Sequence, residues 1–267
     1  MDFLKLQGKT ILVTGVANRR SIAAAVAAVL KEAGARLIYV FKNHELLEKN
    51  RQLIGGDDVP AVACDVADEK QLSSLPQAVA KFTNQLHGLL HSIAFANYSE
   101  GMVPFHDVQR ADFLQAVDVS CFSLTRMCHH LKTLLAPDAS IVTMSISATR
   151  MASESYGYMG PIKAALDASV VFLAKSMAQN VSSEIRVNAV GASPLKTSAS
   201  AGIPGYVDAY LYAEKATLRH RALETREAAD VAAFLLSPRS SGINAQTIIT
   251  DAGMCCNYFD QELIHRS

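Results

Sequence analysis

Short apolar runs alternate with helix-like segments along nearly the whole chain, and this alternation constrains the possible folds more than any other feature. Seven of the runs are apolar on both faces, which is typical of parallel strands that helices cover on either side. The predicted strands are Thr10–Thr14, Arg36–Val40, Val59–Cys64, Gly88–Ile93, Ser140–Met144, Ile185–Val190 and Gln246–Thr250. We therefore predict an α/β fold built on a parallel sheet.

Helical patterns fill the intervals between these strands. We expect helices at Ser21–Ala33, Gln71–Gln85, Arg110–Leu135 and Tyr156–Gln179, and a polar helix that ends near Leu53. The connections are short except for a polar, glycine-containing segment at about 192–215, which is typical of a lid over a binding site. No composition shift or repeat marks a boundary. Residues 1–267 are therefore expected to form one doubly wound, Rossmann-like domain with a seven-stranded sheet and this substrate lid.

Composition excludes several classes of partner. Half of the 267 residues are apolar, which is enough for a substantial core. The 25 acidic and 25 basic residues cancel without a long basic run, so neither nucleic acid nor a membrane is an expected partner. The five cysteines show no zinc pattern, and the first residues do not resemble a signal peptide. We expect a cytoplasmic protein without a metal site.

The first strand leads into a turn that is suited to phosphate. In parallel sheets, ligands bind beyond the carboxyl ends of the strands. Gly15 permits a tight turn there, and Ser21 with Ile22 opens a helix whose positive end would face a pyrophosphate. Gly15 is the only glycine of this segment, so the usual glycine fingerprint is absent. A plain loop with a serine cap is the alternative.

The ends of the second and third strands carry residues suited to a cofactor ribose and adenine. Lys42 stands where a base favours NADPH and an acid would favour NADH, and Arg19 or Arg20 would lie nearby. A solvated surface lysine is the alternative. Asp65, followed by Val66, ends the third strand, where its carboxylate or a neighbouring amide can reach an adenine amine. A helix N-cap is the competing role for Asp65.

Tyr156 precedes Lys163 by seven residues at the start of a long apolar helix. At 3.6 residues per turn, this spacing places both side chains on one helix face, about 10 Å apart. A phenol beside an ammonium can stabilise a developing oxyanion while the lysine holds a neighbouring ligand. Pro161 lies inside this segment, and proline is tolerated in the first turn of a helix but disrupts later turns. The alternative is therefore a helix that begins nearer Gly160, with Tyr156 on a loop before it.

Five segments together resemble the short-chain dehydrogenase/reductase family, specifically its enoyl-acyl-carrier-protein reductase branch. They are Thr14-Gly15-Val16-Ala17-Asn18 with Ser21-Ile22-Ala23, Cys64-Asp65-Val66, His91-Ser92-Ile93-Ala94-Phe95-Ala96, Tyr156-x6-Lys163, and Arg186-Val187-Asn188-Ala189 with Pro194-Leu195-Lys196-Thr197. The resemblance runs from about Leu6 to Met254. Ordinary members of the larger family use Tyr-x3-Lys, and Met159 occupies that tyrosine position here.

The resemblance implies a set of site residues. Tyr156 and Lys163 would be catalytic, and Ala96, Ile146 and Tyr156 would contact the substrate. The cofactor, NADPH with NADH as the alternative, would contact Gly15, Ser21, Ile22, Lys42, Asp65, Val66, Ser92, Ile93, Lys163, Leu195, Lys196, Thr197, Ser198 and Ala199. The partner would be an acyl-carrier-protein or CoA thioester, and the assembly a homotetramer with an interface on the helices Arg110–Leu135 and Tyr156–Gln179.

The implied reaction is reduction of the trans-2 double bond of an enoyl thioester, in fatty-acid or specialised acyl biosynthesis. Hydride from the nicotinamide would reach the β carbon, and Tyr156 would stabilise the enolate oxygen. Two other functions remain open, namely reduction of a ketone or imine and dinucleotide binding without turnover.

The chain departs from the family pattern at four places. Ile146 replaces a second tyrosine, Ala94 and Ser193 replace glycines, and Asp251-Ala252-Gly253 replaces the usual Asp-Gly-Gly. Ile146 removes a polar neighbour from the substrate pocket, and the methyl group of Ala94 narrows it. These departures predict a divergent, specialised member of the branch.

Overall fold

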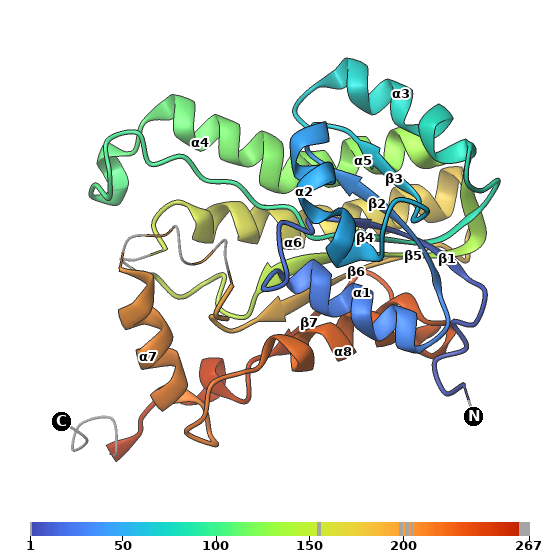
Figure 1. Ribbon diagram of the computed structural model, residues 1–267. Coiled ribbons are helices and arrows are strands. Elements are labelled where there is room, and N and C mark those ends of the chain that lie inside the picture. The colour runs from blue at the N-terminus through green and yellow to red at the C-terminus, as the bar shows by residue number, and fades with distance from the viewer. Residues whose placement is uncertain (1, 154–155, 198–199, 201–202, 204, 262–267) are drawn as a thin grey trace.

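The computed structural model describes residues 2–153, 156–197, 200, 203 and 205–261, and their backbone forms a three-layered α/β structure (Figure 1). The central sheet has seven strands in the order β3-β2-β1-β4-β5-β6-β7, and each neighbouring pair is parallel. The strands are β1 Thr10–Thr14, β2 Arg36–Phe41, β3 Ala61–Ala63, β4 Leu86–His91, β5 Leu135–Ile146, β6 Arg186–Ala192 and β7 Thr247–Thr250. The predicted fold class is confirmed.

Helices cover both faces of the sheet, as Figure 1 shows. One core cluster lies between the sheet and the helices α3 Glu69–Ala80, α4 Arg110–Val117, α5 Ser123–Leu131 and α6 Met159–Asn180. The opposite cluster lies beneath α1 Ile22–Glu32, α2 His44–Ile54 and α8 Thr225–Leu236. Buried alanines line both α1 and α8, and these small side chains allow the two helices to pack closely. No helix in the described part of the chain has the length and apolar character needed to cross a membrane.

Several predicted elements differ from those observed. The expected helix Gln71–Gln85 ends at Ala80. The expected helix Arg110–Leu135 is two helices joined by a π-helical turn at Asp118–Phe122, and its last residue already belongs to β5. Periodicity did not reveal the turn because apolar residues recur on both sides of it.

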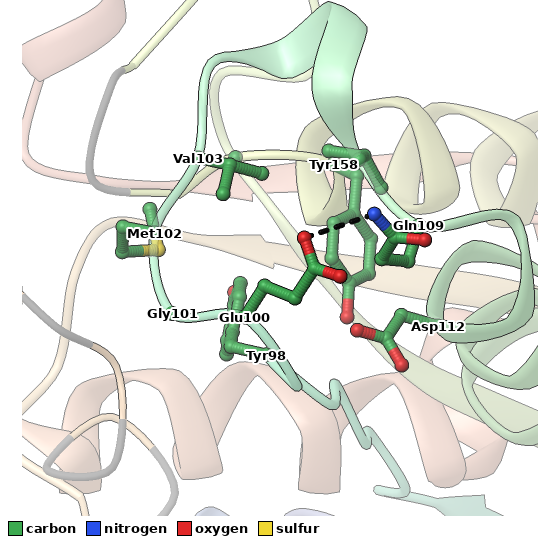
Figure 2. A pocket seen from close by; sticks show the side chains of 10 residues that line it. Tyr98, Glu100, Gly101, Met102, Val103, Gln109, Asp112 and Tyr158 are labelled. Atoms are coloured by element: carbon green, nitrogen blue, oxygen red, sulfur yellow. Dashed lines mark hydrogen bonds between the residues drawn. The ribbon is translucent and has the colours of Figure 1, made fainter.

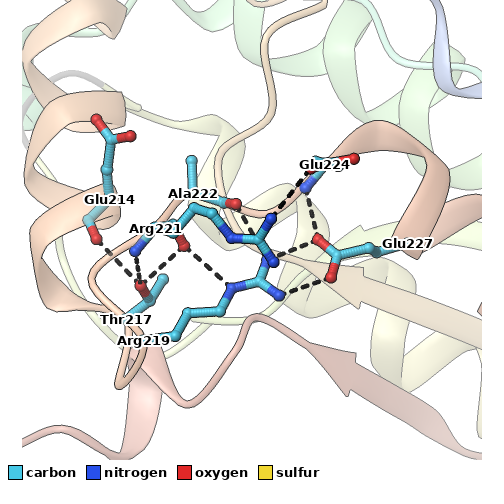
Figure 3. A network of polar contacts seen from close by, with 7 residues as sticks. All are labelled: Glu214, Thr217, Arg219, Arg221, Ala222, Glu224 and Glu227. Carbon is cyan, nitrogen blue, oxygen red and sulfur yellow. Dashed lines mark hydrogen bonds and ion pairs between the residues drawn. The ribbon is translucent and has the colours of Figure 1, made fainter.

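The chain between β6 and β7 contains two helices that were not predicted, α7 Tyr206–Ala216 and α8. The expected lid at 192–215 is therefore helical over its second half. Figure 3 shows how the connection from α7 to α8 is fixed: both carboxylate oxygens of Glu227 accept hydrogen bonds from Arg219 at 2.6 Å. Glu227 also accepts from the Glu224 backbone amide at 2.8 Å, which caps α8.

The turn after β7 shows what one departure from the family pattern, Ala252, does to the backbone. Asp251 accepts hydrogen bonds from the backbone amides of Gly253 and Cys255, both at 2.9 Å. This geometry gives Ala252 a φ of 53° and Gly253 a φ of 82°. The first value is in the left-handed region, which a residue with a Cβ occupies at a cost of about 1–2 kcal/mol.

We expect Ala252→Gly to raise the free energy of unfolding by about 0.5–1 kcal/mol, since the relief of strain exceeds the added entropy of the unfolded chain. Gly253→Ala is the opposing control, because a Cβ there would lie 2.4 Å from Leu218 Cδ1. It should cost about 2 kcal/mol or more. Urea unfolding of the two variants measures both changes. A loss of stability in Ala252→Gly would contradict the strain assigned to this turn.

Candidate active site

The carboxyl ends of β1 and β4 approach each other closely and shape the predicted phosphate turn. Thr14 Oγ1 donates to Leu90 O at 3.0 Å and accepts from the Ser92 amide at 3.2 Å. Gly15 follows with a φ of +86°, and a Cβ at this position would lie 1.9 Å from Ser92 O. The tight turn expected at Gly15 is therefore present, and glycine is required twice over, for its conformation and for its size.

Ser21 forms the N-cap of α1. Its Oγ accepts from Ala24 N at 3.3 Å and donates to Asn18 O at 2.7 Å, and its amide also donates to Asn18 O. Both polar groups of Ser21 are thus engaged within the turn. The residue shapes the start of α1, and the first amides of this helix, beginning at Ile22, form its positive end.

Lys42, Asp65 and Phe95 meet beyond the ends of β2, β3 and β4. Lys42 Nζ lies 3.7 Å from Asp65 Oδ2 and 5.8 Å from the centroid of the Phe95 ring. The alternative role of Asp65 as a helix cap is wrong, because Asp68 caps α3 by accepting from the amides of Lys70 and Gln71. Val66 is buried beside this corner, in the same core cluster that Ile93 and Ala96 contact.

Tyr156 lies in a turn and not on the helix. The first residue of α6 is Met159, so the argument that placed Tyr156 and Lys163 on one helix face is wrong. Pro161 explains the shift, since it occupies the first turn of α6, where its missing amide is tolerated. Burial raises the pKa of the Tyr156 phenol, with smaller contributions from Tyr206 and Tyr98. Tyr156 is therefore a neutral hydrogen-bond donor over the physiological pH range.

Lys163 is buried within α6, at 4% exposure. Its Nζ donates to Met144 O near the end of β5 at 2.8 Å. Burial lowers the pKa of Lys163 to about 8, although Asp167 and Cys121 oppose the shift. A buried ammonium with one carbonyl partner retains donors for a further ligand.

The end of β5 carries polar groups that the fold leaves unsatisfied. The hydroxyls of Ser145 and Ser147 are buried and have no hydrogen-bond partner among the described residues. These two serines flank Ile146, the predicted substrate contact, which is half-buried. Buried polar groups without partners are rare in native proteins and mark sites where a ligand can complete the hydrogen bonding.

The segment after β6 is tied to α7 through residues that sequence reasoning missed. The Tyr206 hydroxyl accepts from Leu195 N at 2.8 Å and donates to Leu195 O at 2.9 Å. Lys196 Nζ lies 4.4 Å from the centroid of the Tyr210 ring, and Thr197 N donates to Ser200 Oγ. The predicted contacts Ser198 and Ala199 lie outside the described residues. No sequence signal identified Tyr206, because α7 was not predicted.

A second missed contact positions the segment after β4. Ser120, in the π-helical turn, accepts from the Phe95 amide at 2.8 Å and donates to Phe95 O at 2.9 Å.

In the described part of the chain, no three His, Cys, Asp or Glu side chains gather as a metal site requires.

These features define a Rossmann-type α/β protein whose glycine turn, buried ammonium and neutral phenol lie beyond the strand ends. Comparison with known proteins gives the family. Residues 15–255 match the family model described as Enoyl-(Acyl carrier protein) reductase. The chain belongs to this enoyl-acyl-carrier-protein reductase family, which confirms the resemblance found in the sequence.

Individual relatives match over nearly their full length. The chain is 34% identical to the NADH-type enoyl-acyl-carrier-protein reductase FabI of Bacillus cereus over 93% of this chain and 97% of that protein. It is 33% identical to the NADPH-type FabI of Staphylococcus aureus over 94% and 98%. The crystal structure of the enoyl-acyl-carrier-protein reductase (NADH) from Aquifex aeolicus superposes with a TM-score of 0.89 at 30% identity, over 96% and 99% of the two chains.

We expect Gly15→Ala to lower the free energy of unfolding by about 3 kcal/mol or more, because it adds both left-handed strain and a clash with Ser92 O. Gly8→Ala is the matched control, since Gly8 has a φ of +72° with open space around it. That variant should lose about 1 kcal/mol. Chemical unfolding of both variants isolates the clash, and equal losses would show that Gly15 is required only for its conformation.

Proposed function

We propose that the protein is an NADPH-dependent reductase of enoyl thioesters, carried by acyl-carrier protein or CoA, in fatty-acid or specialised acyl biosynthesis. The observation that carries the proposal is the neutral Tyr156 phenol and the buried Lys163 ammonium in a chain of this family. Met159, at the position of the ordinary tyrosine, is 3% exposed and lies in the core. It offers no proton donor, which disfavours reduction of a ketone or imine.

The residues present fit a dinucleotide. The close approach at Gly15 and the positive end of α1 suit a pyrophosphate, and the unsatisfied hydroxyl of Ser145 offers a further donor near Lys163. Lys163 would hold the nicotinamide ribose. Leu195, Lys196 and Thr197 would cover the ligand, with Tyr206 holding that segment in place. When bound, the reduced nicotinamide supplies the hydride.

The work of this chain is to stabilise charge on the substrate oxygen. As hydride reaches the β carbon, negative charge collects on the thioester oxygen. Tyr156 would donate a hydrogen bond to that oxygen, and Lys163 would add positive potential. Because the final proton goes to carbon, Tyr156 does not need a lowered pKa, which agrees with its burial.

The basic side chain at the end of β2, where the cofactor ribose would bind, favours NADPH over NADH. Lys42 is the basic residue there, and its side chain is 61% exposed, which leaves it accessible to a 2′-phosphate. Its contact with Asp65 is partly exposed and weak, so a phosphate can compete for it. Relatives of both cofactor types match this chain, and the choice therefore rests on Lys42.

A homotetramer is also proposed, through α4 to α6. Four apolar side chains on these helices and the turn between them are about half exposed or more: Leu114, Phe122, Val171 and Phe172. Phe172 is 78% exposed, and an apolar surface of this kind is typical of an interface. The cytoplasmic location stays a prediction.

The activity is tested with crotonyl-acyl-carrier protein and either NADPH or NADH. We expect consumption of NADPH, and Tyr156→Phe should lower kcat/KM by about a hundredfold through loss of one oxyanion donor. Tyr258→Phe is the control, because Tyr258 is fully exposed.

Three outcomes would reject parts of this proposal. Binding of NADPH without turnover of enoyl thioesters would identify a degenerate homologue. Consumption with ketones alone would identify a carbonyl reductase. Faster turnover with NADH would reject the role given to Lys42.

The pKa of Lys163 predicts a pH dependence of cofactor binding. In the free protein, Lys163 holds its proton below pH 8 and loses it above, because burial lowers its pKa to about 8. We expect the Kd for NADPH to rise above pH 8, by up to about tenfold per pH unit. Lys163→Met should bind more weakly with no break near pH 8. Fluorescence titration at a series of pH values measures the Kd of both proteins. A break near pH 8 in the variant as well would assign the pH dependence to another group.

A further inference from the structure

The Tyr98 hydroxyl is buried and has no hydrogen-bond partner among the described residues. Tyr98 lies on the segment after β4, beside the turn that carries Tyr156. Its ring centroid is 5.4 Å from that of Tyr158, and its Cε1 would lie 3.9 Å from a Cβ built on Gly157. Figure 2 shows Tyr98 and Tyr158 together in the lining of one pocket. The ring thus packs against both residues that follow Tyr156.

The neighbours of Tyr98 are held rigidly. Asp112 accepts from Asn97 Nδ2 at 3.0 Å, and from the Ser99 amide and hydroxyl at 3.0 and 2.7 Å. The Tyr158 hydroxyl donates to Asn97 O. Both residues that flank Tyr98 are therefore fixed, so its ring is oriented before any ligand binds. A buried hydroxyl on so well held a segment, with no partner in the part of the chain that the structure describes, is a group that calls for an explanation.

The Tyr98 phenol keeps its proton and remains a hydrogen-bond donor. Burial raises the pKa of the Tyr98 phenol, so its proton is available for donation. Tyr98 is also one of the two groups whose charge raises the pKa of Tyr156 beyond the effect of burial. The geometric link between the two phenols is the packing of Tyr98 against Gly157 and Tyr158, which directly follow Tyr156 in the chain.

Position 146 itself carries no polar group. By the resemblance found in the sequence, Ile146 stands where the family pattern has a second tyrosine, and its side chain has no hydrogen-bond donor. We propose, on the basis of the reductase function proposed above, that the Tyr98 hydroxyl is the second donor of the substrate pocket and replaces the tyrosine missing at position 146. Its hydrogen bond is made to the thioester oxygen of the acyl substrate, beside that of Tyr156.

Tyr98→Phe removes only the hydroxyl and keeps the ring that packs on Gly157 and Tyr158. We expect kcat/KM for the crotonyl thioester to fall about tenfold, as for the loss of one hydrogen bond in the transition state. The Kd for NADPH should be unchanged, and the Tm should be unchanged or higher, because an unpartnered buried hydroxyl is lost. Tyr39→Phe is the matched control: Tyr39 is buried in β2 on the opposite face of the sheet and should keep full activity.

The double variant Tyr98→Phe/Ile146→Tyr tests the replacement. Its kcat/KM should recover towards that of the natural protein, which a purely structural role of Tyr98 would not produce. Unchanged kcat/KM in Tyr98→Phe, with active natural protein, would overturn this inference and leave the reductase function standing. A loss of kcat/KM that comes with a fall in Tm, or with a loss of NADPH affinity of the same size, would also overturn the inference. Failure of the double variant to recover kcat/KM would overturn it as well. Absence of turnover in the natural protein would overturn both.

Discussion

The contact between the ends of β1 and β4 is the constraint on which the site depends. Thr14 bridges the two strands through Leu90 O and the Ser92 amide, and Gly15 fits against Ser92 O because it has no side chain. This contact fixes where α1 starts and where the segment carrying Phe95 and Tyr98 leaves the sheet. The glycine turn and the segment that carries Phe95 and Tyr98 therefore share a single origin.

The site is arranged at some expense of stability. Lys163 holds its charge in a buried position with a lowered pKa, and the hydroxyls of Tyr98, Ser145 and Ser147 are buried without partners among the described residues. Each unsatisfied group costs on the order of 1–3 kcal/mol. Such groups lie at the end of β5 and on the segments near it, while the buried side chains of Asn188 and Arg186, in β6, form hydrogen bonds with neighbouring backbone and side-chain groups. This distribution agrees with a site that a ligand completes.

The fold was predictable because, along most of the sequence, the spacing of apolar residues matches the faces of the strands and helices that are buried. Residues Thr10–Thr14 form the predicted first strand, and the observed α1, Ile22–Glu32, lies within one residue of the predicted helix Ser21–Ala33 at each end. The site was less predictable because its residues lie where periodicity gives no signal. Tyr156 lies on a turn before α6, because Pro161 moves the start of that helix to Met159. Ser120 holds the Phe95 backbone from a π-helical turn, and Tyr206 belongs to a helix that was not predicted. Their roles depend on tertiary contacts with backbone groups that no local pattern encodes.

The proposed role of Tyr98 connects one departure from the family pattern, Ile146, with a residue that is distant from it in sequence. Ile146 lacks the phenol of the family pattern, while Tyr98 carries a phenol on a backbone that Asp112 has already fixed. Moving a donor from a strand end to a loop changes the direction from which the substrate oxygen is approached. Under the proposed function, such an exchange keeps the oxyanion chemistry and changes which acyl groups fit, which is how a specialised member of the family can arise without loss of Tyr156 or Lys163.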